Sequence, residues 1–199
     1  MNRRNRSIAA LVFALCPASA PRFASASCIA LSKESTFVDC RAVIAPPFMA
    51  GTLYVLAALF ADDAVAGITG AEFRIEGFPA SWFTSAVLNP AWTATGDPLG
   101  TGCSVAMPSC QGGPGSSNLV LLYTLTYFPT DMAVHIVNVV TSSPPADPLF
   151  DCPVVKMCNG DRYCVTGGYF WFNDFGPCEV ALQPATWSQV KALYMDATR

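Results

Sequence analysis

The feature that most constrains the fold is that the apolar segments are short and are repeatedly interrupted by turn-forming residues. In the hexapeptide AEFRIE at 71–76, small or apolar residues alternate with charged ones, which gives an extended strand one apolar and one charged side. Turn-forming sequences such as Asn89-Pro90, GGPG at 112–115 and Pro144-Pro145 separate segments of this kind. The pattern predicts half-buried β-strands joined by tight connections.

Segments rich in β-branched and aromatic residues are the predicted strands. They are 36–44, 52–60, 71–76, 82–87, 103–107, 119–127, 133–140, 154–158, 163–165, 169–173 and 179–182. Their regular spacing predicts an all-β protein, an antiparallel β-sandwich of jelly-roll or immunoglobulin-like type, rather than an α/β fold. The sequence CNGD at 158–161 predicts a tight hairpin within it.

One helix is predicted, at 186–199. Thr186 and Gln189 have the spacing of a capping box, and four apolar residues fall on one helical face: Trp187, Val190, Leu193 and Tyr194. Because so short a helix is marginal alone, we expect it to dock on an open end or edge of the sheet. Residues 27–185 then form the sandwich domain, with a possible subdivision near 141–148.

The N-terminal residues 1–26 have the layout of a secretory signal peptide. Three arginines precede an apolar run at 8–16, and Ala24-Ser25-Ala26 supplies small residues for cleavage after Ala26. The apolar run is shorter than the ~20 residues of a spanning helix, which disfavours a membrane anchor. A lipid anchor at Cys16 or Cys28 is a minor alternative. We therefore expect a secreted protein, extracellular or periplasmic.

Eight cysteines remain after residue 26, an even number that predicts disulfides in an oxidising compartment: Cys28, Cys40, Cys103, Cys110, Cys152, Cys158, Cys164 and Cys178. The expected pairs are Cys28 with Cys40 and Cys103 with Cys110, with the last four pairing among themselves to staple the C-terminal strands. The spacing of those four lacks the close Cys-x2-4-Cys knuckles of structural zinc sites, so no metal is assigned to them.

The acidic charge argues against nucleic acids and anionic membranes as partners. Four of the eleven basic residues lie before residue 27 and no acidic residue does, so seven basic and fourteen acidic residues remain, a net charge of −7. An acidic domain is a poor ligand for nucleic acid, which is bound through clustered Lys and Arg. No segment after the signal is expected to span a membrane.

No catalytic residue is assigned. His135 is the one histidine, no Gly-x-Ser-x-Gly motif accompanies it, and we interpret it as a hydrogen-bonded strand residue. A glycosidase needs two opposed carboxylates, whereas Glu72 and Glu76 flank Arg74 as a charge row. Aspartates in turn-like sequence, such as Asp97 and Asp147, are expected to accept bonds from nearby amides. Because calcium binds carboxylate oxygens, these aspartates also make calcium a possible ligand, and no other cofactor is predicted.

Four consecutive aromatic residues at 169–172, YFWF, are the most distinctive candidate site. Alternation places Tyr169 and Trp171 on one face of a strand and the two phenylalanines on the other. If the phenylalanine face is core, the first pair is available to stack on a sugar, and Trp82 and Trp92 pose the same choice. The alternative is that both faces are buried.

The segment at 67–75, GITGAEFRI, resembles a strand of cohesin-like and related carbohydrate-binding β-sandwiches of exported bacterial proteins. The resemblance implies a jelly-roll-like sandwich with an extracellular binding or scaffolding role and no catalytic residues. The cysteine-rich second half departs from the cohesin pattern. The closing sequence TWSQVKALY at 186–194 is similar to the ends of exported proteins of environmental bacteria, which implies a docking or sorting element.

These observations together predict an exported, non-enzymatic binding or structural module at or outside the cell surface. Its expected partner is a polysaccharide, bound through Tyr169 and Trp171, or a cell-surface protein. The alternative function is that of a secreted hydrolase whose Asp or Glu residues meet only in the fold.

Overall fold

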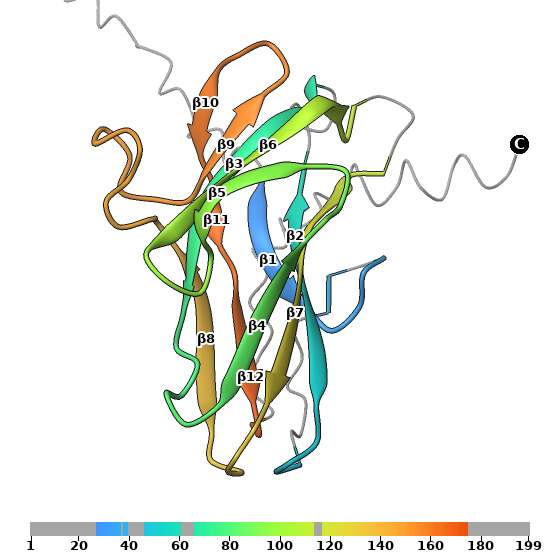
Figure 1. Ribbon diagram of the computed structural model, residues 1–199. Helices are drawn as coiled ribbons and strands as arrows, with labels where there is room; N and C mark the ends of the chain where they lie inside the picture. The colour runs from blue at the N-terminus through green and yellow to red at the C-terminus, as the bar shows by residue number, and fades with distance from the viewer. Residues whose placement is uncertain (1–26, 37, 40–45, 61–65, 114–116, 175–199) are drawn as a thin grey trace, which may run out of the picture.

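The computed structural model describes residues 27–36, 38–39, 46–60, 66–113 and 117–174 (Figure 1). The predicted signal peptide at 1–26, the predicted strand at 179–182 and the predicted helix at 186–199 lie outside these residues, as does most of the segment at 36–44. In the part of the chain that is described, no helix is long and apolar enough to cross a membrane.

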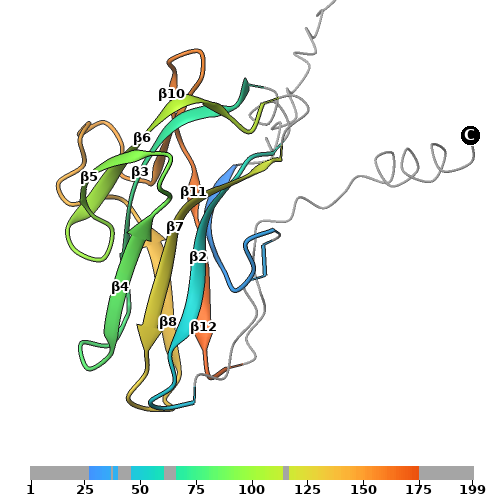
Figure 2. The same ribbon diagram turned by 45° about the vertical axis from the view of Figure 1, so that its right-hand side comes forward.

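The described residues fold into a sandwich of two β-sheets (Figures 1 and 2). The strands are β1 (Cys28–Ser32), β2 (Gly51–Ala58), β3 (Ile68–Glu76), β4 (Phe83–Leu88), β5 (Thr93–Asp97), β6 (Gly102–Gln111), β7 (Leu119–Phe128), β8 (His135–Val140), β9 (Val154–Met157), β10 (Arg162–Cys164), β11 (Thr166–Gly167) and β12 (Tyr169–Phe172). The smaller sheet has the order β11-β1-β2-β7-β4. The predicted all-β sandwich is confirmed.

The larger sheet is organised around β3. One edge of β3 pairs with β6, which pairs in turn with β5. The other edge is shared by two strands, because β9 pairs with residues 68–72 and β8 with residues 74–76. Strand β10 extends the sheet beyond β9, and β12 extends it beyond β8. The segment at 141–153 therefore joins two strands that lie along the same edge of β3.

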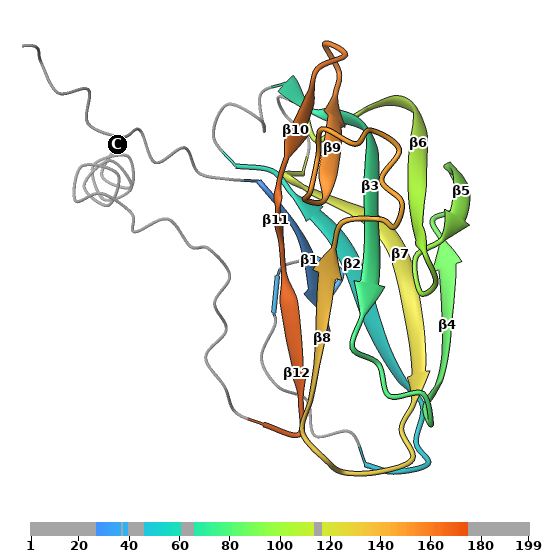
Figure 3. The same ribbon diagram turned by 90° about the vertical axis from the view of Figure 1, so that its left-hand side faces the viewer.

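The last three strands close one side of the sandwich by pairing with both sheets (Figure 3). Strands β10 and β12 belong to the larger sheet, whereas β11 pairs with β1 of the smaller sheet in parallel orientation. Gly168 lies at the junction: its carbonyl accepts the N–H of Val139 at 2.9 Å and its own N–H donates to the carbonyl of Ile29 at 2.8 Å. One residue thus bonds to a strand of each sheet.

The junction requires glycine because three strands converge on it. A Cβ added at Gly167 would lie 1.8 Å from the carbonyl oxygen of Val139, and one at Gly168 would lie 3.0 Å from the Cα of Ala30. Backbone atoms cannot yield as the end of a flexible side chain can. A side chain at position 167 would force the last strand away from β8.

The core between the sheets follows the alternation seen in the sequence. Phe73 and Ile75 of the AEFRIE segment are buried, whereas Glu76 is exposed. In the YFWF segment the two phenylalanines, Phe170 and Phe172, are fully buried. Burying a large apolar side chain of this kind stabilises a fold by about 1.5–3 kcal/mol.

Trp82 is the centre of an aromatic cluster at one end of this core. Its ring stacks on Tyr127 with centroids 6.0 Å apart, and Phe172 meets both rings edge-on, at 5.1 Å from Trp82 and 4.9 Å from Tyr127. Edge-to-face and offset pairs at these separations are the favourable arrangements of aromatic rings. The cluster joins β4, β7 and β12, so it ties the last strand to the smaller sheet.

Three strands were not expected from the sequence, among them the two-residue strand β11. Strand β1, CIALS, is buried along its whole length and shows no alternation. Strand β5, TATGD, is exposed throughout and has no apolar side to mark it. Both are defined by their hydrogen-bonded neighbours, β2 and β6, rather than by their own side chains. The predicted hairpin at 158–161 is confirmed, since β9 and β10 pair across it and the N–H of Met157 donates to Asp161.

Two disulfides are described, and they correct the expected pairing. Cys152 bonds to Cys164, within the C-terminal group as predicted, but Cys158 bonds to Cys110. The predicted pair of Cys103 with Cys110 is wrong, because Cys110 is bonded to Cys158 and Cys103 is a free thiol. The disulfides indicate an oxidising environment.

Cys28 and Cys103 are free, buried thiols. The predicted bond between Cys28 and Cys40 is therefore wrong: Cys28 packs instead with Ala30 and Ala58, and Cys40 lies outside the described residues. Burial raises the pKa of Cys28 to about 11. Burial likewise raises the pKa of Cys103 to about 12, against the opposing hydrogen bond from Tyr123. The thiolate, which is the reactive form, is thus suppressed at neutral pH.

These cysteines give a chemical test of the fold. Peptide mapping of the unreduced protein should recover the pairs Cys110–Cys158 and Cys152–Cys164. Iodoacetamide at about pH 8 should modify Cys28 and Cys103 only after denaturation, because both thiols are buried and protonated in the native protein. A peptide in which Cys103 is joined to Cys110 would contradict the structure.

A second test concerns the glycine junction. Gly167→Ala should destabilise the protein by about 1–3 kcal/mol or more, because its Cβ meets a backbone carbonyl. Gly113→Ala is the matched control, since a Cβ there has no atom within 4 Å. Thermal and urea unfolding measure both variants. Equal stability of the two would show that the last strand does not approach β8 as described.

Candidate functional site

The outer surface of the larger sheet carries the aromatic pair found in the sequence. Cross-strand register places Trp171 of β12 opposite Ile136 of β8, and Tyr169 opposite Asn138. The same register continues into β3, where Glu76 lies opposite Asn138. We call this surface the binding face, defined by Arg74, Glu76, Ile136, Asn138, Tyr169 and Trp171.

The two aromatic rings of the binding face are half-buried and do not form one flat platform. Their centroids are 6.3 Å apart and their planes meet at 82°, so a sugar could lie parallel to only one of them. Ile136, which is 39% exposed, extends the apolar surface beside Trp171. The two rings and Ile136 together form a short apolar strip with an uneven surface.

Trp171 has a polar atom that packing does not satisfy. Its indole Nε1 is shielded from solvent and has no acceptor within the described part of the chain. An unsatisfied buried donor costs about 1–3 kcal/mol. A phenylalanine at this position would offer a ring without that penalty, so the indole is not explained by stability alone.

Charged groups border the apolar strip on β3. Arg74 and Glu76 form an ion pair at 3.0 Å, and Nε of Arg74 donates to the carbonyl of Thr141 at 3.4 Å. These contacts hold the guanidinium beside the strip. An exposed ion pair contributes little to folding stability, which leaves its charges available to a partner.

The other two tryptophans of the sequence prediction lie elsewhere. Trp82 is 5% exposed and belongs to the aromatic cluster of the core. Trp92 is partly buried in the connection between β4 and β5, where it packs against the core. The structure therefore brings together Tyr169 and Trp171 and separates them from Trp82 and Trp92.

A cavity of about 230 Å³ lies farther along the larger sheet, between its outer surface and the 141–153 segment. Glu72 and Asp147 both line it, together with Lys156 and Arg162. Two carboxylates at one cavity are what the hydrolase alternative requires. The hydrogen bonds of these two carboxylates show what they do in the structure.

Both carboxylates hold the segment that covers the cavity. Glu72 Oε1 accepts the hydroxyl of Ser142 and the N–H of Ala146, the latter at 2.7 Å. Asp147 Oδ1 accepts the N–H of Leu149 at 3.1 Å, and its other oxygen faces Arg162 at 3.8 Å. The turn role predicted for Asp147 is confirmed, as is that of Asp97, whose Oδ1 accepts the N–H of Leu99. These contacts give both carboxylates a structural role.

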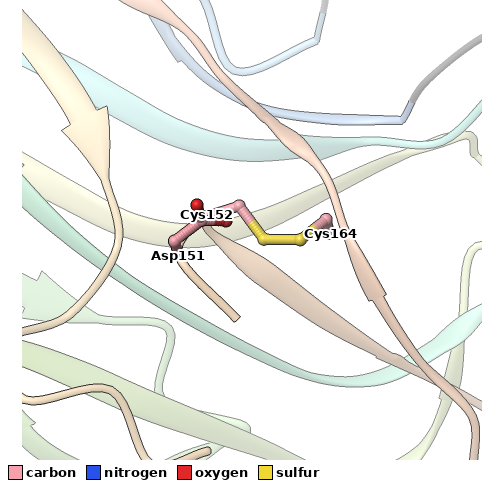
Figure 4. Close-up of side chains that lie close together, drawn as sticks. All are labelled: Asp151, Cys152 and Cys164. Atoms are coloured by element: carbon pink, nitrogen blue, oxygen red, sulfur yellow. A yellow bond between two sulfur atoms is a disulfide. The ribbon is translucent and has the colours of Figure 1, made fainter. Parts of the chain in front are cut away.

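One group of potential metal ligands occurs among the described residues: Asp151, Cys152 and Cys164 (Figure 4). The two sulfurs are bonded to each other, so they are not available as thiolate ligands. The group thus presents a single exposed carboxylate. Calcium normally takes six to eight oxygen ligands, and this group does not supply them.

His135 points into the aromatic end of the core rather than toward a nucleophile. Its Nε2 lies 2.7 Å from Asp131 Oδ1, and its ring meets Trp82 edge-on at 5.1 Å. Asp131 also accepts the Trp82 indole N–H at 3.1 Å and the Ala133 N–H at 2.9 Å. The carboxylate thereby joins the β7–β8 turn to the core.

The sandwich was compared with proteins of known sequence and structure. No protein-family model matches the sequence, and no curated protein matches it. Among solved structures, the cohesin module of a family 33 glycoside hydrolase from Clostridium perfringens aligns with a TM-score of 0.53 at 8% identity, covering 75% of this chain and 98% of the module. The protein has a cohesin-like fold.

A second cohesin gives the same result. A type II cohesin domain from the cellulosome of Acetivibrio cellulolyticus aligns with a TM-score of 0.51 at 12% identity, covering 74% of this chain and 95% of that domain. At such identities the likeness concerns the backbone arrangement alone. The cohesin-like resemblance inferred from the GITGAEFRI segment is confirmed at the level of the fold.

Sequence reasoning missed Ile136, Arg74 and Glu76 as members of the binding face. Arg74 and Glu76 were recognised as a charge row, and alternation in 133–140 could have put Ile136 on the outer side of its strand. No local signal shows that β8 lies between β12 and β3. This order of strands determines which residues share the binding face.

The Asp131 contacts predict a dependence of stability on pH. The hydrogen bond with His135, the Ala133 N–H and the Trp82 N–H lower the pKa of Asp131 below 3.8. A carboxyl whose pKa is lower in the folded state contributes stability above its unfolded pKa and loses it as the pH falls through the folded pKa. Below pH 3.8 the native protein should therefore lose stability faster than Asp131→Asn, as measured by urea unfolding at several pH values. Parallel curves for the two proteins would contradict this role.

Proposed function

We propose that the protein is an exported, non-catalytic binding module that holds a partner protein on the binding face of its larger sheet. The observation that carries the proposal is the grouping of Trp171, Tyr169 and Arg74 on one exposed surface. Tryptophan, tyrosine and arginine are the residue types that most often dominate the energetics of protein interfaces.

The layout of the face also favours a protein over a flat ligand. The rings at 82° and the neighbouring Ile136 make an uneven apolar strip, which suits the shape complementarity of a protein surface. The pair of Arg74 and Glu76 at its border offers both signs of charge, which would orient a partner and set the rate of encounter. The cohesin-like fold supports the module class, since its similar structures are a module of a glycoside hydrolase and a domain of a cellulosome.

A glycan is the second candidate partner. Tyr169 is half-buried, and the polar side chains of Asn138 and Glu76 lie in register beside it. An aromatic ring with hydrogen-bonding groups at its edge can stack on a sugar and bond to its hydroxyls. In this case one ring, rather than the pair, would carry the stacking.

Four variants of the oxidised mature protein test the proposal. Trp171→Ala and Arg74→Gln alter the binding face, Tyr169→Ala isolates the second ring, and Thr52→Ala changes an exposed residue of the other sheet as the matched control. Each is first checked for a native unfolding midpoint. Immobilised proteins are then exposed to the exported proteins of the same organism, and bound species are quantified.

Support for the proposal is a defined partner bound equally by wild type and Thr52→Ala and at least tenfold more weakly by both Trp171→Ala and Arg74→Gln. A partner retained equally by Trp171→Ala would overturn it. Co-sedimentation with insoluble cellulose, chitin and cell-wall preparations at two salt concentrations tests the second candidate. Salt-resistant retention that is lost in Tyr169→Ala or Trp171→Ala would replace the protein partner with a glycan.

A further inference from the structure

Strand β4 leaves one side of the sandwich open. It is the last strand of the smaller sheet, and among the described strands its one hydrogen-bonded neighbour is β7 (Figure 2). Strand β5, at the corresponding edge of the larger sheet, lies beyond the end of β4 rather than alongside it (Figure 3). Thr84 borders a cavity of about 380 Å³ that is lined also by Phe78, Trp82 and Leu99. The residues that the structure describes therefore leave space beside this edge.

The ladder with β7 identifies the backbone groups that face outward. Leu88 lies opposite Tyr123, and the next residue, Asn89, donates its N–H to the carbonyl of Leu122 at 3.1 Å. In an antiparallel pair the bonded positions alternate, so the odd-numbered residues of β4 bond to β7. The N–H and C=O groups of Thr84, Ala86 and Leu88 then point away from the sheet. In the described part of the chain, none of these outward groups has a backbone hydrogen-bond partner outside the ladder with β7.

This edge lacks the features that normally prevent strands from pairing. Edge strands are usually protected by a lysine, a proline, a bulge or extreme shortness. The sequence FTSAVL has no charge and no proline, and its register with β7 runs without a shift from Phe83 to Leu88. Phe83 and Val87, on the outer side, are 67% and 62% exposed. The edge is regular, uncharged and apolar.

The strand is also complementary to itself. When two copies run antiparallel about a two-fold axis at Ser85, Thr84 of each lies opposite Ala86 of the other, and these are the residues with outward-facing backbone groups. Phe83 then lies opposite Val87 on the outer side, a cross-strand pair of an aromatic and a β-branched residue. The symmetry yields about four backbone hydrogen bonds.

The strands behind β4 place no charge at this edge. Neither β7 nor β2, the next two strands of the smaller sheet, contains a charged residue. The cavity beside the edge is lined by Arg74 and Glu76, which form an ion pair at 3.0 Å. An isologous contact of this kind closes on itself and stops at a dimer.

From these observations we propose that two copies of the protein pair through the edges of β4, so that the smaller sheets form one continuous sheet across a two-fold axis at Ser85. The contact uses the edge of the other sheet, although Arg74 and Glu76 of the binding face line the same cavity as Thr84, and it does not depend on the proposed function. Because it rests on one strand per copy, the dimer is expected to be weak and dependent on concentration.

Sedimentation velocity of the oxidised mature protein over a hundredfold concentration range provides the first test. Wild type should shift from monomer to dimer. Ala86→Pro should stay monomeric at every concentration, because it removes an outward N–H that is unbonded in the monomer and so leaves the fold intact. Ala86→Ser, which keeps that N–H, is the matched control and should dimerise. A monomeric wild type, or a dimer that survives Ala86→Pro, would overturn the proposal.

A cross-linking experiment tests the position of the axis. Ser85 is opposite its own copy at a non-bonded position, where Cα atoms are about 4.5 Å apart, within the range of a disulfide. Ser85→Cys should therefore give a covalent dimer on mild oxidation, whereas Thr52→Cys, on the same sheet but distant from the axis, should not. Equal cross-linking of the two variants, or none at position 85, would contradict an axis at Ser85.

Discussion

The sandwich depends on the point where the last strand crosses between the two sheets. Gly168 bonds to β8 of the larger sheet and to β1 of the smaller one, and Gly167 approaches β8 so closely that no side chain fits. These contacts place the rest of the segment. They direct Phe170 and Phe172 into the core, and the outward side chains of β12 follow from the same register.

The segment that closes the fold therefore also supplies the candidate site. Trp171 and Tyr169 alternate with the two buried phenylalanines, so their orientation is fixed by the core on the other side of the strand. A binding surface built on a strand that is bonded and packed in this way has little freedom to move. The disulfide of Cys152 with Cys164 constrains the same part of the chain, directly before β11 begins.

Local patterns in the sequence correctly predicted the features that depend only on a segment's own side chains. The alternation in AEFRIE and YFWF, the Asn159-Gly160 turn and the turn roles of Asp97 and Asp147 all correspond to the structure. Features that depend on distant neighbours were missed. Strand β5 has no apolar side, and Cys110 meets Cys158 through the arrangement of β6 and β9. Trp82 resembled Trp171 in the sequence, yet its indole N–H finds Asp131 and its ring becomes core.

The parallel pairing of β1 with β11 has a mechanical consequence. Both strands run in the same direction, so tension applied between the beginning of β1 and the end of β12 pulls them along their axes in opposite senses. The bonds from Ser27, Ile29 and Gly168 across this junction would be loaded together, in shear, instead of opening one after another as in a hairpin pulled from its open end. A sandwich closed in this way resists stretching most strongly along the line that joins the two ends of its described chain.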